Sequence, residues 1–224
     1  FGAFAQEEDG DLLATAFSAI SSEDWVTADH YASQMSDPIG SDLVTWQRLR
    51  RGEGHWDEYA DFLKENPEWP GLQRLRRLGE AAIPENHNAA DVRAYFSKQL
   101  PQTGTGSLRL TEAFATQGRT ADARSEAVRA WTTLNLQQHE MTGLLTKFAG
   151  SLSRYHQKRM DFLLWDGHTR EAERMLPLVS PDQQKLALAR IALQRASKGV
   201  DLVIKEVPAS LQNDGGLAYD RFQW

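Results

Sequence analysis

Apolar residues recur along most of this chain at intervals of three and four positions, which places them on one face of an α-helix. Two clear stripes run from Ala123 to Leu134 and from Met141 to Leu152. Comparable stripes cover 12–20, 25–35, 59–63, 92–100, 172–179 and 186–196. The short apolar run Leu202–Ile204 follows the same period, so we expect a helix there rather than a strand. The pattern predicts an all-α fold of short helices.

One short phrase recurs where one stripe ends and the next begins. Its copies are Glu23-Asp24-Trp25-Val26-Thr27-Ala28, Gly54-His55-Trp56-Asp57-Glu58-Tyr59, Gly118-Arg119-Thr120-Ala121-Asp122-Ala123 and Gly167-His168-Thr169-Arg170-Glu171-Ala172. A Gly that ends one helix, followed by turn residues and an acidic first turn, is typical of a helix-turn-helix unit. Such units bury their apolar faces by stacking. We therefore expect a right-handed superhelix of stacked antiparallel helix pairs, similar to tetratricopeptide-like solenoids.

The first residues suggest export. Ala3-Phe4-Ala5 fits the small-x-small pattern that precedes a signal-peptidase cut, and polar residues follow it. A frayed native N-terminus is the alternative interpretation. We expect residues 1–11 to be a disordered segment left after signal cleavage and residues 12–224 to form one α-superhelical domain. Segments 84–88 and 103–106 are candidate points of subdivision within that domain.

Composition narrows the classes of function. The net charge of -6 over 224 residues argues against a general nucleic-acid binder. Residues 1–46 contain acidic side chains but no Lys or Arg, so this segment either docks on a basic surface or is a solvated face. The chain has no cysteine, which excludes disulfides and cysteine-based sites. No apolar run reaches the ~20 residues that a transmembrane helix needs.

Catalytic motifs are absent from the sequence. The segment His139–Gly143 lacks the second His of a zincin helix, and no Gly-x-Ser-x-Gly elbow occurs. The other histidines show no metal-ligand spacing, so we expect neither a metal site nor a cofactor. Glu112 lies beside apolar residues, as a glycosidase acid would. A solvated or ion-paired helical Glu is the favoured interpretation of that residue.

Two arginine-rich segments and two tryptophans are the candidate ligand contacts. Arg48, Arg51, Arg74 and Arg77 belong to clusters that could meet anionic groups, although solvated helix faces are the favoured account. The chain has seven Trp, and aromatic faces stack on sugar rings. Most of these rings are expected to pack between helices. Trp56 and Trp69 lie near turns and are the two that we expect to be free for a ligand.

Four phrases together resemble the N-terminal superhelical region of soluble lytic murein transglycosylases. They are Asn66-Pro67-Glu68-Trp69-Pro70-Gly71, Thr103-Gly104-Thr105-Gly106-Ser107-Leu108-Arg109-Leu110, Arg159-Met160-Asp161-Phe162-Leu163-Leu164-Trp165 and Gly216-Leu217-Ala218-Tyr219-Asp220-Arg221-Phe222-Gln223-Trp224. The resemblance extends from about residue 12 to the end.

This resemblance implies an exported, periplasmic protein of a Gram-negative bacterium. Members of the family carry a U-shaped helical region that precedes a lysozyme-like domain. That domain cleaves the bond between N-acetylmuramic acid and N-acetylglucosamine, using one Glu in a Glu-Ser motif. This sequence contains no Glu-Ser dipeptide, so no catalytic residue is carried over.

The sequence therefore predicts a non-catalytic scaffold that positions peptidoglycan for a lytic transglycosylase. Its expected partners are the glycan strand and the C-terminal catalytic domain of the parent protein, with no nucleic acid and no transmembrane segment. A helical-repeat adaptor that binds a protein or peptide is the alternative. A self-contained enzyme is the third and least favoured hypothesis.

Overall fold

The computed structural model describes residues 2–224, with side chains from Glu8 onward. The described residues form helices, turns and bends and contain no strand, which confirms the predicted all-α class. The right-handed sense of the expected superhelix stays a prediction. None of the described helices combines the length and the apolar character needed to cross a membrane.

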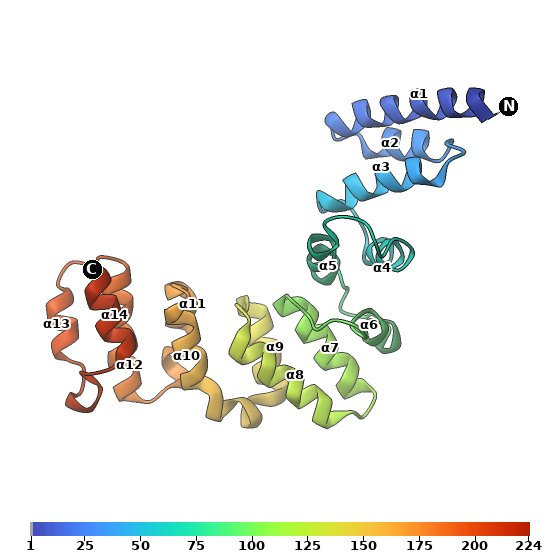
Figure 1. The fold of residues 1–224 in the computed structure, drawn as a ribbon. Coiled ribbons are helices and arrows are strands. Elements are labelled where there is room, and N and C mark those ends of the chain that lie inside the picture. Colours follow the sequence, from blue (N-terminus) through green and yellow to red (C-terminus); the bar gives the residue numbers. More distant parts are fainter. Residues whose placement is uncertain (1) are drawn as a thin grey trace. The chain divides into compact units, whose positions relative to one another are not determined.

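Contacts between helices divide the chain into two compact units, with the boundary between Asn86 and His87. The boundary falls within 84–88, one of the two candidate points of subdivision, and the single superhelical domain over 12–224 stays a prediction. The first unit contains α1 (Gly2–Ser21), α2 (Trp25–Ala32), α3 (Pro38–Arg50), α4 (Trp56–Glu65) and α5 (Leu72–Ala81) (Figure 1).

The second unit holds the remaining helices, including short 3₁₀ turns labelled η. They are α6 (Ala89–Tyr95), α7 (Gly104–Thr116), α8 (Thr120–Thr133), α9 (Gln138–Leu152), η1 (Ser153–Tyr155), α10 (His156–Trp165), α11 (Thr169–Met175), η2 (Leu176–Leu178), α12 (Pro181–Gln194), α13 (Val200–Lys205), η3 (Ala209–Leu211) and α14 (Gly215–Gln223). Helix α13 contains Leu202–Ile204, as the apolar period predicts.

Helices pack mainly against their neighbours in sequence, and each unit has its own core. In the first unit, α1, α2 and α3 contact one another around Ala16, Ile20 and Ala28. In the second unit, Trp131 on α8 is fully buried in a cluster with Ala127, Leu144 and Leu163. Small residues such as alanine let neighbouring helices approach closely, while the one large ring fills the space between several of them.

The repeated phrase marks a specific joint between helices. Gly118 and Gly167 follow α7 and α10 with φ of 71° and 73°, in the left-handed region. The next residue then bonds back over the last turn, from Arg119 N to the Phe114 carbonyl at 2.9 Å and from His168 N to the Leu163 carbonyl at 2.8 Å. This is the hydrogen bond of a Schellman ending, which satisfies a carbonyl that the finished helix leaves unpaired.

The same joint recurs where the sequence offers no glycine. Glu23 after α1 has φ of 58°, and Ala196 after α12 has φ of 49°. The residue that follows each of them makes the same backward hydrogen bond. Asp24 N donates at 3.0 Å and Ser197 N at 2.9 Å. In the copy that begins at Gly54, the left-handed residue is instead Gly52, two positions earlier. The glycine in the phrase is thus not always the residue that makes the turn.

The last residue of the phrase is buried in every copy. The third position begins a helix each time, and the sixth position then lies on its inner face. Ala28, Ala123 and Ala172 are 0% exposed and Tyr59 is 1% exposed. The phrase therefore fixes both the end of one helix and the first core contact of the next.

The N-terminal segment differs from the expectation of disorder over 1–11. Helix α1 begins at Gly2 and continues without a break to Ser21, and Phe1 lies outside the described residues. The carboxylate of Asp9 accepts hydrogen bonds from Ser36 N, Ser36 Oγ and Asp37 N at 2.8–2.9 Å. These bonds lower the pKa of Asp9 and join α1 to the turn before α3. The proposed signal-cleavage pattern, Ala3-Phe4-Ala5, lies in this helix, and its side chains are outside those described.

Exchanging glycine and non-glycine residues at these joints should have opposite effects on stability. Gly118→Ala and Gly167→Ala should each lower the free energy of unfolding by about 1 kcal/mol, because an L side chain is strained at positive φ. A Cβ at either position would meet no atom within 4 Å, so the effect is confined to the backbone. Glu23→Gly and Ala196→Gly should instead raise the free energy of unfolding by a few tenths to about 1 kcal/mol.

Urea denaturation followed by circular dichroism measures these changes. Gly150→Ala is the matched control, because Gly150 lies within α9 with equally open space around it and has no left-handed φ. That variant should be neutral or stabilising, since Ala is the better helix former. Equal effects of the Ala substitution at 118, 167 and 150 would contradict the proposed role of the joints.

Candidate functional site

The residues that the sequence singles out as ligand contacts all belong to the first unit. They are Arg48 and Arg51 at the end of α3, Trp56 at the start of α4, Trp69 in the turn before α5, and Arg74 and Arg77 on α5. Arg74 Nε donates to the Arg50 carbonyl at 3.1 Å, so the structure brings the two arginine clusters together at the C-terminal end of α3.

Arg48 is held inside the protein by three acceptors. Its Nη2 lies 2.5 Å from Glu58 Oε1, its Nε lies 3.3 Å from Asp29 Oδ1, and its Nη1 donates to the Glu53 carbonyl at 2.9 Å. The hydrogen bond from Arg48 lowers the pKa of Glu58, against the smaller opposing effect of burial. Since its side chain is 13% exposed, Arg48 joins α2, α3 and α4 rather than facing solvent.

Arg51 and Arg74 also donate hydrogen bonds to carbonyls at helix ends. Arg51 Nη1 donates to the Ile20 carbonyl in the last turn of α1 at 2.8 Å, and its guanidinium lies 5.4 Å from the Trp25 ring centroid. Cations near the C-terminus of a helix pair with its unsatisfied carbonyls and with its dipole. Arg77 is exposed on α5. Arg74 and Arg77 therefore retain exposed surface that a ligand could reach.

Trp56, one of the two tryptophans expected to be free for a ligand, is instead buried. It is 6% exposed, because the first turn of α4 turns it toward the core. Trp69 is half-buried, with its ring centroid 5.4 Å from that of Phe62 and 5.9 Å from that of Trp46. Both rings lie near turns, as the sequence indicates, but proximity to a turn does not decide which way a ring points.

Glu112 is ion-paired, as the favoured interpretation of the sequence states. Its carboxylate lies 2.8 Å from both Arg109 Nη1 and Lys147 Nζ. Burial raises the pKa of Glu112, but the hydrogen bonds from Lys147 and Arg109 outweigh it, so the pKa lies below its ordinary value. A general acid needs a raised pKa, and Glu112 therefore does not fit that role.

An open groove of about 450 Å³ lies between α6, α7 and α8 in the second unit. Its apolar lining consists of Phe96, Leu100, Leu110 and Phe114. Polar and charged residues complete it, namely Arg93, Ser97, Arg119, Asp122, Ser125, Glu126 and Arg129. An apolar surface with a few convergent polar groups is the usual composition of a ligand site.

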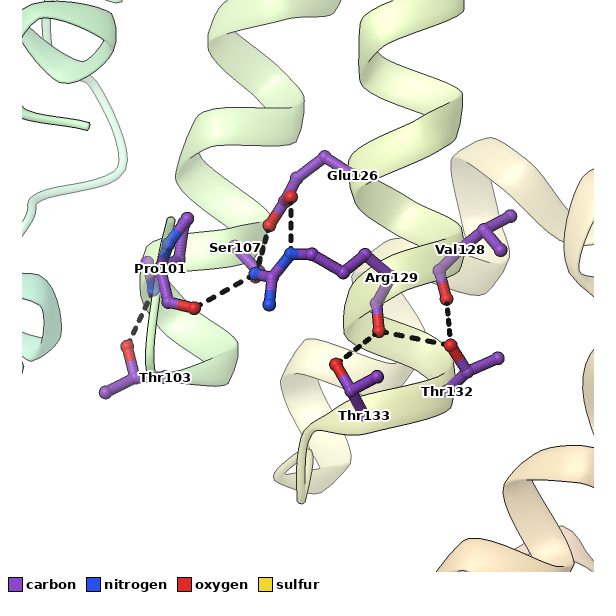
Figure 2. Close-up of polar contacts among 9 residues, drawn as sticks. Pro101, Thr103, Ser107, Glu126, Val128, Arg129, Thr132 and Thr133 are labelled. Carbon is purple, nitrogen blue, oxygen red and sulfur yellow. Dashed lines mark hydrogen bonds and ion pairs between the residues drawn. The ribbon is translucent and has the colours of Figure 1, made fainter. Parts of the chain in front are cut away.

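One wall of this groove is held by a network around Arg129 (Figure 2). Arg129 reaches from α8 to the Pro101 carbonyl at 3.0 Å and to Ser107 Oγ at 2.7 Å. The Glu126 carboxylate accepts from Arg129 Nε at 2.8 Å and from Ser107 Oγ at 2.5 Å. Because Glu126 is 5% exposed and paired on both oxygens, this wall is rigid and close to neutral.

Two buried guanidiniums in the second unit were not predicted from the sequence. Arg159 is 1% exposed and donates to the carbonyls of Trp131 and Leu134, at the end of α8, at 2.8 and 3.0 Å. Burial lowers the pKa of Arg159 to about 10. Arg190, also 1% exposed, lies 2.7 Å from Asp220. An Arg inside an otherwise apolar helical stripe is the signal that could have identified both.

The described residues place no three His, Asp or Glu side chains together as a metal site would require. No protein-family model, no curated protein and no solved structure matches this chain. The groove between α6 and α8 is a candidate site, and its carboxylates Asp122 and Glu126 are held in ion pairs with Arg119 and Arg129. The exposed arginines of α5 stay a predicted contact surface.

Arg159→Ala should lower the free energy of unfolding of the second unit by about 3 kcal/mol, because two helix-end carbonyls lose their donor and a cavity remains. Its neighbour Lys158 is exposed, so Lys158→Ala is the matched control and should change stability by less than about 0.5 kcal/mol. Urea denaturation of both variants measures the difference. A similar effect of the two substitutions would show that Arg159 does not support α8.

Asp161→Asn should stabilise the protein at neutral pH. Burial raises the pKa of Asp161 above its ordinary 3.8, the Arg190 charge partly offsets this, and Asp214 adds to it. The folded state therefore holds the proton more tightly than the unfolded state, and stability falls as the pH rises through the raised pKa.

The advantage of Asp161→Asn should shrink as the pH falls and vanish below about 3.8, where both states of the parent chain are protonated. Urea midpoints between pH 3 and 8 measure this trend. Glu206→Gln on the exposed end of α13 is the control and should give a nearly constant difference. A constant advantage for Asp161→Asn as well would refute the electrostatic explanation.

Proposed function

We propose that this chain is the non-catalytic scaffold of a periplasmic lytic murein transglycosylase. In this role it positions peptidoglycan for a catalytic domain that is not part of the chain. The support is the placement of the four phrases that carry the resemblance to that family. Each phrase contains at least one residue held by a specific contact in the fold.

The first two phrases lie at turns. Trp46 Nε1 donates to the Pro70 carbonyl at 3.0 Å, so the Asn66–Gly71 turn is fastened to α3. Thr103 Oγ1 caps α7 by accepting from Gly106 N at 3.0 Å. Gly104 contacts the buried carboxylate of Glu140 so closely that any Cβ there would collide with it. The last two contacts explain why the second phrase contains threonine at 103 and glycine at 104.

The last two phrases meet in the second unit. Trp165 ends α10 and Tyr219 lies on α14, with ring centroids 5.4 Å apart. Between them, the Arg190 guanidinium lies 5.1 Å from the Trp165 ring and pairs with Asp220. This convergence of two phrases separated in sequence is the observation that carries the proposal, since it indicates that they act as one packing unit of a helical scaffold.

Binding to purified peptidoglycan sacculi tests the proposal. At low salt the chain should sediment with the sacculi, and the bound fraction should fall at high salt if exposed arginines contribute. Arg74→Gln with Arg77→Gln should weaken binding by several-fold. Lys198→Gln with Lys205→Gln removes the same charge from exposed positions outside the candidate surface and should leave binding unchanged.

A chain that stays wholly in the supernatant at low salt would contradict direct binding of the glycan. Release of anhydro-muropeptides by this chain alone would contradict a non-catalytic role. Capture of one defined protein partner without any binding to sacculi would favour the helical-repeat adaptor instead.

A further inference from the structure

The groove between α6 and α8 presents apolar surface that the protein itself does not cover. Leu100 is 61% exposed at its edge, and Phe114 is half-buried on the α7 side. Two guanidiniums converge on the Phe114 ring from different elements. Arg119 lies 4.9 Å and Arg93 lies 6.0 Å from its centroid. Stacked arginines keep their outer N–H groups directed toward an incoming acceptor.

The charges in this groove do not cancel. Arg119 pairs with Asp122 at 2.7 Å, and Arg129 pairs with Glu126 at 2.6 Å. Arg93 instead donates to the neutral amide oxygen of Gln117, and no described carboxylate lies within ion-pair distance of it. The groove therefore carries one uncompensated positive charge beside an apolar floor. The complementary ligand has a single carboxylate next to an apolar side chain.

We infer that the α6–α8 groove binds a short acidic peptide segment, with a carboxylate received by Arg93 and Arg119 and an adjacent apolar side chain seated between Leu100 and Phe114. A groove of about 450 Å³ holds a few side chains rather than a folded domain. Ser97 and Ser125 supply hydroxyl groups that can pair with the peptide backbone. This site is independent of glycan binding by the first unit.

Fluorescence anisotropy with labelled hexapeptides tests the inference on the full chain. The probes alternate Glu with Leu, Ala or Phe, and each has a counterpart in which Gln replaces Glu. The Glu–Leu or Glu–Phe peptide should bind roughly tenfold more tightly than its Gln counterpart, because a charge-assisted hydrogen bond is lost in the latter. Its affinity should fall as salt rises.

Variants then locate the site. Arg93→Gln with Arg119→Gln should weaken binding of the Glu peptide by roughly tenfold or more and leave binding of the Gln peptide nearly unchanged. Leu100→Ser should weaken both peptides, and it changes an exposed side chain that does not support the core. Arg124→Gln removes an exposed charge from α8 outside the groove and should have no effect. Circular dichroism confirms that each variant is folded.

Two results would overturn the inference. One is that no Glu peptide binds more tightly than its Gln counterpart. The other is that the Arg93→Gln, Arg119→Gln variant binds as the parent does. Because these probes contain no sugar, the two proposals can fail separately. The chain can fail to bind sacculi while the groove still binds peptide, or it can bind sacculi while the groove binds no peptide.

Discussion

The structure depends on how each helix ends. A short helix leaves its last carbonyls without partners, and a fold made of many short helices multiplies that problem. Here a left-handed residue turns the chain at the recurring joints, and side chains from following helices donate to the remaining carbonyls. These donations are Arg51 to Ile20, Tyr59 to Leu49, Arg74 to Arg50, Arg159 to Trp131 and Gln194 to Leu164. Each one fastens the end of a helix to a later helix.

This arrangement explains why most of the arginines that resemble ligand contacts in the sequence are structural. Arginine offers five donors in a planar group, so one side chain can satisfy two carbonyls or a carbonyl and a carboxylate. Arg48 and Arg159 do so in the two units, in largely buried positions where replacement by a smaller residue would leave acceptors unpaired. Clusters of arginine in a helical repeat can therefore indicate helix ends as readily as ligands.

The apolar period was sufficient to predict the all-α class and the helices beneath its stripes, and the repeated phrase several of the joints, because both depend on residues close together in sequence. The stripes did not mark α3, α5, α7, α10 and α14. The two patterns were not sufficient to identify the left-handed residue. Glu23 and Ala196 adopt that conformation because packing of the helices on both sides over-determines the turn. Likewise, the groove could not be predicted, since Arg93, Phe114 and Arg129 come from three helices whose faces meet only in the folded protein.

An arginine that can bind a ligand differs from a structural one in the groups that lie within its reach. An arginine is committed to the fold when a helix end or a carboxylate of a neighbouring helix lies within its reach, as for Arg129, which meets both the Pro101 carbonyl and Glu126. Arg93 extends from α6 and meets only an amide and an aromatic ring. A guanidinium held in place by neutral contacts keeps its orientation without losing its charge. That combination of a fixed position and an unneutralised charge distinguishes the α6–α8 groove from the arginine-rich end of α3.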